Sequence, residues 1–197
     1  MLMGAAGCGQ EAMVRMLLQR SASVDLQIQN SHTALMIAAG RGFPAIVRML
    51  LEAKASINLP NCFGATALMA ASSLGRTSTV QLLFGYSAIP DVQDGQGLTA
   101  LMLAVEEGHT PIVQLLLDAK ADTTLRDNHG ETALEIAESR ENTAAAQLLR
   151  RHGQSPPPPA SAPAPAAEAL ASVLPPRIFD AACSGEVREV AAWLAQG

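Results

Sequence analysis

Small and apolar residues recur along the first 153 residues of this chain with a constant spacing. The sequence Thr-Ala-Leu-Met occupies residues 33–36, 66–69 and 99–102, and Thr-Ala-Leu-Glu occupies residues 132–135, so the period is 33 residues each time. The residue one period before Leu35 is Leu2, and the same order of apolar residues continues from Leu2. A fixed period of this size predicts a solenoid of stacked repeats, whose function is usually binding.

Each period predicts two short helices, and residues 31–58 illustrate the first. Thr33 is a candidate N-cap, because its hydroxyl can accept a hydrogen bond from a backbone N–H group of the first turn. Leu35 and two alanines, Ala38 and Ala39, follow at helical spacing and give this helix one narrow apolar face. Gly42 is placed where the chain must turn towards the second helix.

The second helix is expected from about Pro44 to Ala53. Its apolar residues are spaced to face both the partner helix and the neighbouring repeats; they are Ile46, Val47, Leu50 and Leu51. Proline suits the first helical turn, where its missing N–H group costs nothing. After the third copy, residues 99–102, Thr110 precedes Pro111, which predicts a hydroxyl cap at the start of that second helix.

Polar, turn-rich connectors follow the second helices. Residues 58–64, 91–97 and 124–130 each end in a glycine, namely Gly64, Gly97 and Gly130. A glycine at this position favours a tight, hairpin-like turn that projects from the stack. The pattern as a whole predicts an all-α solenoid of antiparallel helix pairs with projecting turns.

These residues resemble the ankyrin repeat, in which two antiparallel helices alternate with a projecting β-turn. The most specific match is the sequence of residues 108–117, Gly-His-Thr-Pro-Ile-Val-Gln-Leu-Leu-Leu. The resemblance covers residues 1–153 and implies an ankyrin-repeat array of five units. We place these units at about 1–28, 29–61, 62–94, 95–127 and 128–153. The resemblance also implies a protein–protein interaction module or scaffold.

The chain departs from the ankyrin pattern at two positions of the repeat. Met36, Met69 and Met102 stand where the family has a histidine that hydrogen-bonds between repeats, so we expect soft apolar packing there instead. The glycine that follows the second helix in the family is replaced, and the replacements are Ser21, Lys54, Ser87 and Lys120. If that position still needs a positive φ, each replacement costs on the order of 1 kcal/mol.

Composition changes abruptly after residue 153. Residues 154–176 are rich in Pro and Ala, which predicts an extended linker. Residues 177–197 repeat the apolar order of one helix pair and read as a partial ankyrin-like unit, the start of a second array; this unit is either marginal alone or docked on the first array. Because Met1 falls inside a first helix, we also expect the chain to be a fragment of a longer protein.

The charge and the cysteine content of the chain argue against several kinds of ligand and site. The net charge is −5 and the pI is about 5.3, so nothing favours binding to nucleic acid or to an anionic membrane. Three distant cysteines predict neither a disulfide framework nor a zinc site. No apolar run is long enough to span a bilayer. We expect a monomeric intracellular protein, most simply cytoplasmic, with the nucleus left open.

No constellation for catalysis is apparent. The four histidines fall in different repeats, no nucleophile is spaced beside a base, and the glycines of residues 4–9 lack the Lys and Ser/Thr of a phosphate loop. We therefore expect no enzyme activity, no cofactor and no metal.

The family's concave face, made of the turn tips and the ends of the first helices, then becomes the candidate partner-binding surface. The register selects Gln29, Asn30, His32, Arg41, Cys62, Phe63, Ser73, Leu74, Gln96, Leu98, Glu106, Glu107, Asn128, His129, Glu131 and Arg140. From these we predict nine contact residues: Arg41, Phe63, Leu74, Gln96, Leu98, Glu106, Glu107, His129 and Arg140.

Within this set Phe63, Leu74 and Leu98 suggest an apolar strip, and Glu106 with Glu107 suggests a site for a basic group of the partner. The strip has a plain alternative, since Leu74 or Leu98 could instead tuck between repeats, and single exposed apolar residues are normal. The competing function is a rigid spacer in a larger multidomain protein whose activity lies outside this chain.

Overall fold

The computed structural model describes residues 1–27 and 31–153, and the helices within these ranges form five antiparallel pairs. We call the pairs units 1 to 5. Their helices are α1 (Leu2–Gly7) and α2 (Glu11–Gln19), α3 (Ala34–Arg41) and α4 (Pro44–Glu52), α5 (Ala67–Ser73) and α6 (Thr77–Gly85), α7 (Ala100–Glu106) and α8 (Thr110–Asp118), and α9 (Ala133–Ser139) and α10 (Thr143–Gly153).

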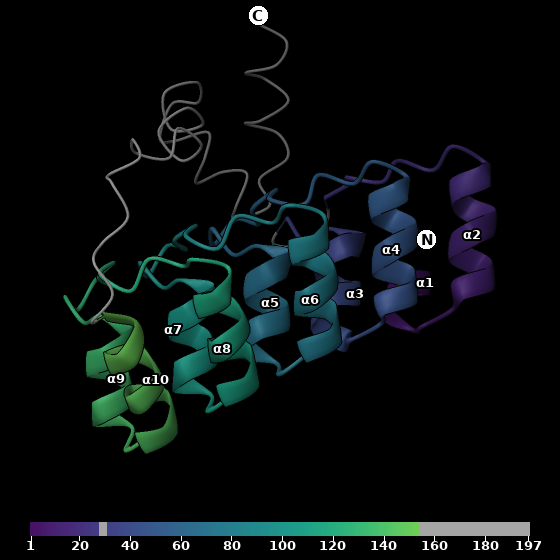
Figure 1. Ribbon diagram of the computed structural model, residues 1–197. Helices are drawn as coiled ribbons and strands as arrows, with labels where there is room; N and C mark the ends of the chain where they lie inside the picture. Colours follow the sequence, from purple (N-terminus) through teal and green to yellow (C-terminus); the bar gives the residue numbers. More distant parts are fainter. Residues whose placement is uncertain (28–30, 154–197) are drawn as a thin grey trace, which may run out of the picture.

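The first helices of the units stack on one another, and so do the second helices, which gives an elongated stack two layers deep (Figure 1). Within the described ranges the β-structure is limited to isolated bridges, one of which joins Arg126 and Thr132. The chain is therefore an all-α solenoid, as the 33-residue period predicts. The predicted linker, residues 154–176, and the predicted partial unit, residues 177–197, lie outside the described residues.

Threonine caps start the first helices of units 2 to 5. The Thr33 hydroxyl accepts a hydrogen bond from the Met36 N–H group at 3.2 Å, and Thr99 does the same for Met102 at 3.2 Å. Thr66 and Thr132 occupy the same cap position. The predicted caps are confirmed, and they fix where each first helix begins.

The second helix of unit 4, α8, does not start as the sequence predicts. Helix α8 begins at Thr110 itself, its N-cap is His109, and no side chain makes a capping hydrogen bond there. The prediction of a Thr110 cap was wrong, because the chain turns at Gly108, with φ 76°, and the cap position falls on His109, one residue earlier than predicted. Pro111 still lies in the first turn, where the absence of its N–H group is tolerated.

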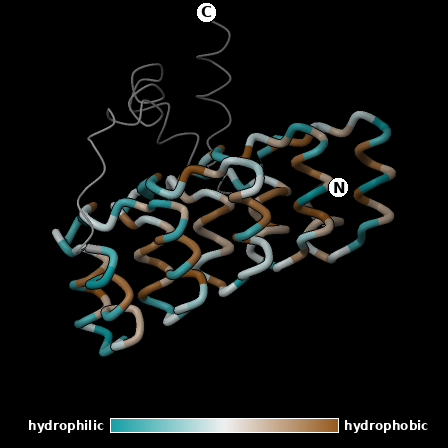
Figure 2. Tube along the Cα trace, in the orientation of Figure 1, coloured by the Kyte–Doolittle hydropathy of each residue, from teal (hydrophilic) through white to brown (hydrophobic). Residues whose placement is uncertain are grey.

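The core lies between the layers and between successive units, and it consists mainly of Ala, Leu, Val, Ile and Met. Figure 2 shows that the hydrophobic positions lie mostly along the helices. Met36, Met69 and Met102 are 4%, 1% and 1% exposed, so they fill the junctions between units. The expected replacement of a polar contact by flexible apolar packing is confirmed at these three positions.

Side chains nevertheless form hydrogen bonds between neighbouring units, from positions just before the second helices. In units 3, 4 and 5 the residue just before the second helix reaches back to a carbonyl group of the first helix of the preceding unit. Arg76 Nε donates to the Gly40 carbonyl at 3.0 Å, and His109 Nε2 donates to the Ser73 carbonyl at 3.0 Å. Asn142 Nδ2 likewise donates to the Val105 carbonyl at 3.1 Å. These bonds add a partner to carbonyl groups in the last turns of the first helices, where the regular hydrogen-bond pattern of the helix ends.

The predicted positive φ after the second helix is present in every unit where the sequence replaced glycine. The φ angles are 57° at Ser21, 68° at Lys54, 64° at Ser87 and 65° at Lys120. The left-handed region is costly for residues with a Cβ atom. Each of these four residues therefore holds backbone strain that the family's glycine avoids.

The connectors project from the stack as tight hairpins, as predicted. In each hairpin one carboxylate or amide oxygen accepts two backbone hydrogen bonds: Asn61 Oδ1 binds the N–H groups of Phe63 and Ala65, both at 2.9 Å. Asp94 and Asp127 occupy the same position in the next two hairpins. Gly64 has φ 79°, and a Cβ atom there would lie 2.9 Å from Asp94 Cα, so the close stacking of hairpins requires glycine.

Candidate functional site

Two rows of side chains run along the stack at the predicted surface. The first, the hairpin row, consists of Phe63, Gln96 and His129, which are one period apart and exposed. The hairpins that carry the row are held together by backbone hydrogen bonds. Gly95 N–H donates to the Phe63 carbonyl at 2.7 Å, and Asn128 N–H donates to the Gln96 carbonyl at 2.9 Å. The side chains of the hairpin row therefore extend from hairpins that are hydrogen-bonded to one another.

The second row, the helix row, lies where the first helices end. It consists of Arg41, Leu74, Glu107 and Arg140, again one period apart and exposed in each of these four units. Exposure is constant along the row while the chemistry changes from cationic to apolar to anionic to cationic. A position that is exposed in each of these units while its side chain varies is not constrained by packing, so it is free to serve recognition.

A hollow of about 210 Å³ connects the two rows between α7 and α9. Its lining residues are Gln96, Leu98, Glu106, Asp127, His129, Glu131, Ile136, Ser139 and Arg140. Leu98 and Ile136 provide its apolar surface, and the carboxylates outnumber the cations. The mixture suits a side chain that has an apolar stem and a positive end.

The charged groups at one end of the hollow are already paired. The Arg140 guanidinium is bonded to the Glu106 carboxylate, with side chains 57% and 30% exposed. Glu106 is therefore not available to a basic group of a partner unless Arg140 is displaced, which revises the expectation for this residue. Glu107 is exposed, and its carboxylate makes no ion pair within residues 1–27 and 31–153.

The predicted apolar strip is only partly present. Phe63 is 59% and Leu74 is 55% exposed, so both offer apolar surface to a partner. Leu98 is half-buried and packs against the core. Leu98 thus lines the hollow and is not an exposed contact residue. This agrees with the alternative that one of these leucines packs between units.

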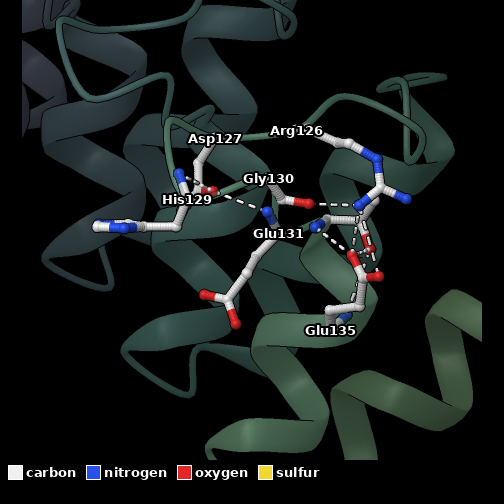
Figure 3. A network of polar contacts seen from close by, with 7 residues as sticks. Arg126, Asp127, His129, Gly130, Glu131 and Glu135 are labelled. Carbon is white, nitrogen blue, oxygen red and sulfur yellow. Dashed lines mark hydrogen bonds and ion pairs between the residues drawn. The ribbon is translucent and has the colours of Figure 1, made fainter.

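A second polar cluster holds the hairpin that carries His129 and Glu131 (Figure 3). Arg126 donates to the Gly130 carbonyl and forms an ion pair with Glu135 at 3.1 Å. Glu135 in turn accepts hydrogen bonds from the Thr132 N–H group at 2.6 Å and the Thr132 hydroxyl at 2.7 Å. These bonds from Thr132, followed by the charge of Arg126, lower the pKa of Glu135 below its usual value.

This cluster leaves the neighbouring side chains pointing elsewhere. Figure 3 shows the His129 ring and the Glu131 carboxylate directed away from the Arg126–Glu135 pair. Both side chains line the hollow. The Arg126–Glu135 cluster therefore holds the hairpin in place, and the Glu131 side chain stays available to a ligand.

The family model described as ankyrin repeats, three copies, matches residues 2–94 and 78–158 of the chain. The chain belongs to the ankyrin repeat family. Ankyrin repeats are generally protein–protein interaction modules and are typically not enzymes. No curated protein matches the chain significantly. Within residues 1–27 and 31–153 no helix combines the length and apolar character needed to cross a membrane.

The ankyrin array brings five of the nine predicted contact residues to one hollow: Gln96, Leu98, Glu106, His129 and Arg140. Arg41, Phe63, Leu74 and Glu107 lie on the two rows outside it. Gln29 and Asn30 of the wider set lie outside the described residues. In the described part of the array, no group of three or more His, Cys, Asp or Glu side chains could hold a metal ion.

Sequence reasoning missed three residues of the hollow: Asp127, Ile136 and Ser139. The repeat register could have found one of them, because Ser139 is one period after Glu106. Asp127 and Ile136 occupy positions that read as a hairpin residue and a core residue. Their second role, as lining, follows only from the three-dimensional arrangement.

Proposed function

We propose that this ankyrin array binds a partner protein through the face formed by the hairpin row, the helix row and the hollow between α7 and α9. The single observation that supports this most strongly is the hollow itself, since it joins both rows and combines apolar walls with carboxylates.

The chemistry of the surface favours a partner segment with one basic and one apolar side chain. Glu131 lines the hollow and Glu107 lies on the helix row outside it, so both carboxylates attract a basic group of the segment to this end of the face. Phe63 and Leu74 offer apolar surface in the next unit along the stack. The segment thus lies along the stack, with its basic side chain towards unit 5.

A selection from a random peptide library tests this function. Peptides selected on the full chain are expected to carry Lys or Arg together with a large apolar residue. For one such peptide, the double substitution Glu107→Gln and Glu131→Gln is expected to weaken binding by roughly tenfold or more, which corresponds to about 1.4 kcal/mol. The substitution Phe63→Ser is expected to weaken binding separately.

Glu52→Gln is the matched control, because Glu52 is an exposed carboxylate on the second-helix layer. It should leave the affinity unchanged. Peptides without basic residues, or a loss of affinity with Glu52→Gln but not with the double substitution, would contradict the proposal. Failure to select any peptide whose binding depends on this face would favour the rigid-spacer function instead.

A further inference from the structure

The exposed apolar side chains of the inner units gather at the middle of the array. Within residues 31–153 the exposed large apolar side chains are Phe63 at 59%, Leu74 at 55% and Ile89 at 41%. Phe63 comes just before the two helices of unit 3, Leu74 lies between them, and Ile89 follows them. Phe63 and Leu74 also belong to the hairpin row and the helix row. The two rows therefore have an apolar centre in the central unit.

The helix row carries opposite charges on the two sides of this centre. Arg41 lies one unit before Leu74, Glu107 lies one unit after it, and both charged side chains are exposed. Neither forms an ion pair within the residues that the structure describes. The two ends of the array differ in the same sense. Residues 1–61 contain five basic and three acidic side chains, and residues 95–153 contain five basic and nine acidic ones.

This order of side chains is complementary to its own reverse. In a contact between two copies with a two-fold axis, residue i meets residue j and residue j meets residue i. An axis at Leu74 opposes the two copies of this leucine and brings Arg41 opposite Glu107 on both sides. Because the units repeat with one spacing, the two rows stay in register. An axis at Arg41 or at Glu107 would instead oppose two like charges, which costs binding energy.

The neighbouring positions are compatible with the same axis. Ile37, Ala70 and Leu103 lie one helical turn before the three central residues of the row, on the same side of their helices, and all three are apolar and half-buried. An axis at unit 3 brings Ile37 opposite Leu103. Arg140 falls opposite the uncharged Cys8 and keeps its ion pair with Glu106 in its own chain.

We propose that two copies of this chain associate in antiparallel orientation through the helix rows of units 2 to 4, with the two-fold axis at Leu74. The contact spans only three units, which is typical of weak complexes that bury less than about 1,200 Å². A dimer differs from the monomer expected from the sequence, because composition does not show which charges share one row. The inference does not rest on the proposed partner function. Where both hold, a peptide over Leu74 and Glu107 excludes the second copy.

Sedimentation velocity of the full chain over a wide range of protein concentrations, without any peptide, tests the dimer. The apparent mass is expected to rise from 20.5 kDa towards twice that value as the concentration increases. Arg41→Glu and Glu107→Arg each place two pairs of like charges in the dimer, so each should raise the dissociation constant by roughly tenfold or more. Because both side chains are exposed, far-UV circular dichroism should show an intact array.

Complementary variants test the pairing itself. The double substitution Arg41→Glu and Glu107→Arg in one chain restores opposite charges at both contacts, so its dissociation constant should return to within a few-fold of that of the original chain. An equimolar mixture of the two single variants should also associate. Arg48→Glu is the matched control, because it makes the same charge change at an exposed position of α4, in the second-helix layer. It should leave the association unchanged.

Three results would overturn the proposal. The first is a mass that stays at 20.5 kDa at every concentration. The second is a dimer that Arg48→Glu weakens as much as Arg41→Glu does. The third is a double variant that remains monomeric where the original chain is a dimer. None of these results bears on the selection of basic peptides, so the dimer and the partner function can fail separately.

Discussion

Arg140 and Glu106 form an ion pair that links α9 to α7, from one unit to the next. The pair forms one end of the hollow, and both side chains keep contact with solvent. Its position has a direct consequence for recognition. A basic group that enters the hollow pairs with Glu131 and competes with Arg140 for Glu106.

Removing the guanidinium should therefore strengthen the binding of a basic peptide. Arg140→Gln releases the Glu106 carboxylate and removes a like charge, so we expect the dissociation constant to fall several-fold and its salt dependence to steepen. Stability should change by no more than about 1 kcal/mol, because the pair is exposed. Titration of a selected peptide at two salt concentrations measures both effects. Weaker binding by Arg140→Gln would show that Arg140 itself contacts the partner.

A buried hydroxyl in α5 provides a stability test. Ser72 is fully buried, and its Oγ atom has no hydrogen-bond partner within the described residues, while Ala6 and Ala39 hold the same register position. Ser72→Ala should raise the free energy of unfolding by about 1 kcal/mol, since an unsatisfied buried polar group is removed. Urea unfolding measures the change. Ser73→Ala, at a half-buried neighbour, should have an effect within about 0.5 kcal/mol, and an equal gain there would refute the explanation.

Backbone strain after the second helices predicts a second substitution that stabilises the array. Lys120 has φ 65°, and Lys120→Gly should stabilise the array by about 1 kcal/mol because glycine adopts this conformation without a steric cost. Ala119 precedes it with φ −78°, so Ala119→Gly should destabilise. Thermal or urea unfolding of the two variants gives the comparison. Destabilisation by both would mean that the loss of the Lys120 side chain outweighs the relief of strain.

Much of the fold could be predicted from the sequence because its determinants are local. Thr33 caps a helix through its own first turn, and Gly64 sets a turn through its own φ angle. The contacts of Arg76, His109 and Asn142 could not be predicted in this way. Each reaches a carbonyl group about one period away, and three different side chains do the same task. No shared residue type marks that position.

The candidate surface was predictable only in outline. The register identifies the exposed rows, since Leu74 and Glu107 follow the same helix end in successive units. It does not show which charges are already paired, so the pairing of Glu106 with Arg140 could not be predicted. The burial of Leu98 likewise depends on packing across units.

Asp91 makes the stability depend on pH. Burial raises its pKa above the usual 3.8, a hydrogen bond from the Asp122 N–H group at 2.8 Å opposes this, and the nearby Asp122 charge adds to the rise. A raised pKa means that the contribution of this group to stability is complete below pH 3.8 and is lost as the pH rises through the folded-state pKa. At neutral pH the ionised Asp91 is therefore a cost.

Asn58 shows how to remove that cost. It holds the same position one unit earlier and accepts a hydrogen bond from the Ile89 N–H group at 3.0 Å without a charge. Asp91→Asn should stabilise the array at pH 7, and the gain should shrink as the pH falls towards about 4. Asn58→Asp should do the reverse. Urea unfolding at several pH values measures both, and a gain from Asp91→Asn that is constant with pH would contradict the assignment to ionisation.

The most direct test of the proposed partner surface is an amide hydrogen-exchange footprint of the full chain with a selected basic peptide. Protection is predicted in the hairpins at residues 94–98 and 127–131 and in α7 and α9, where the hollow lies. The helices α8 and α10 of the second layer should exchange as they do in the absence of peptide. Protection confined to α8 and α10, with the hairpins unchanged, would contradict the account.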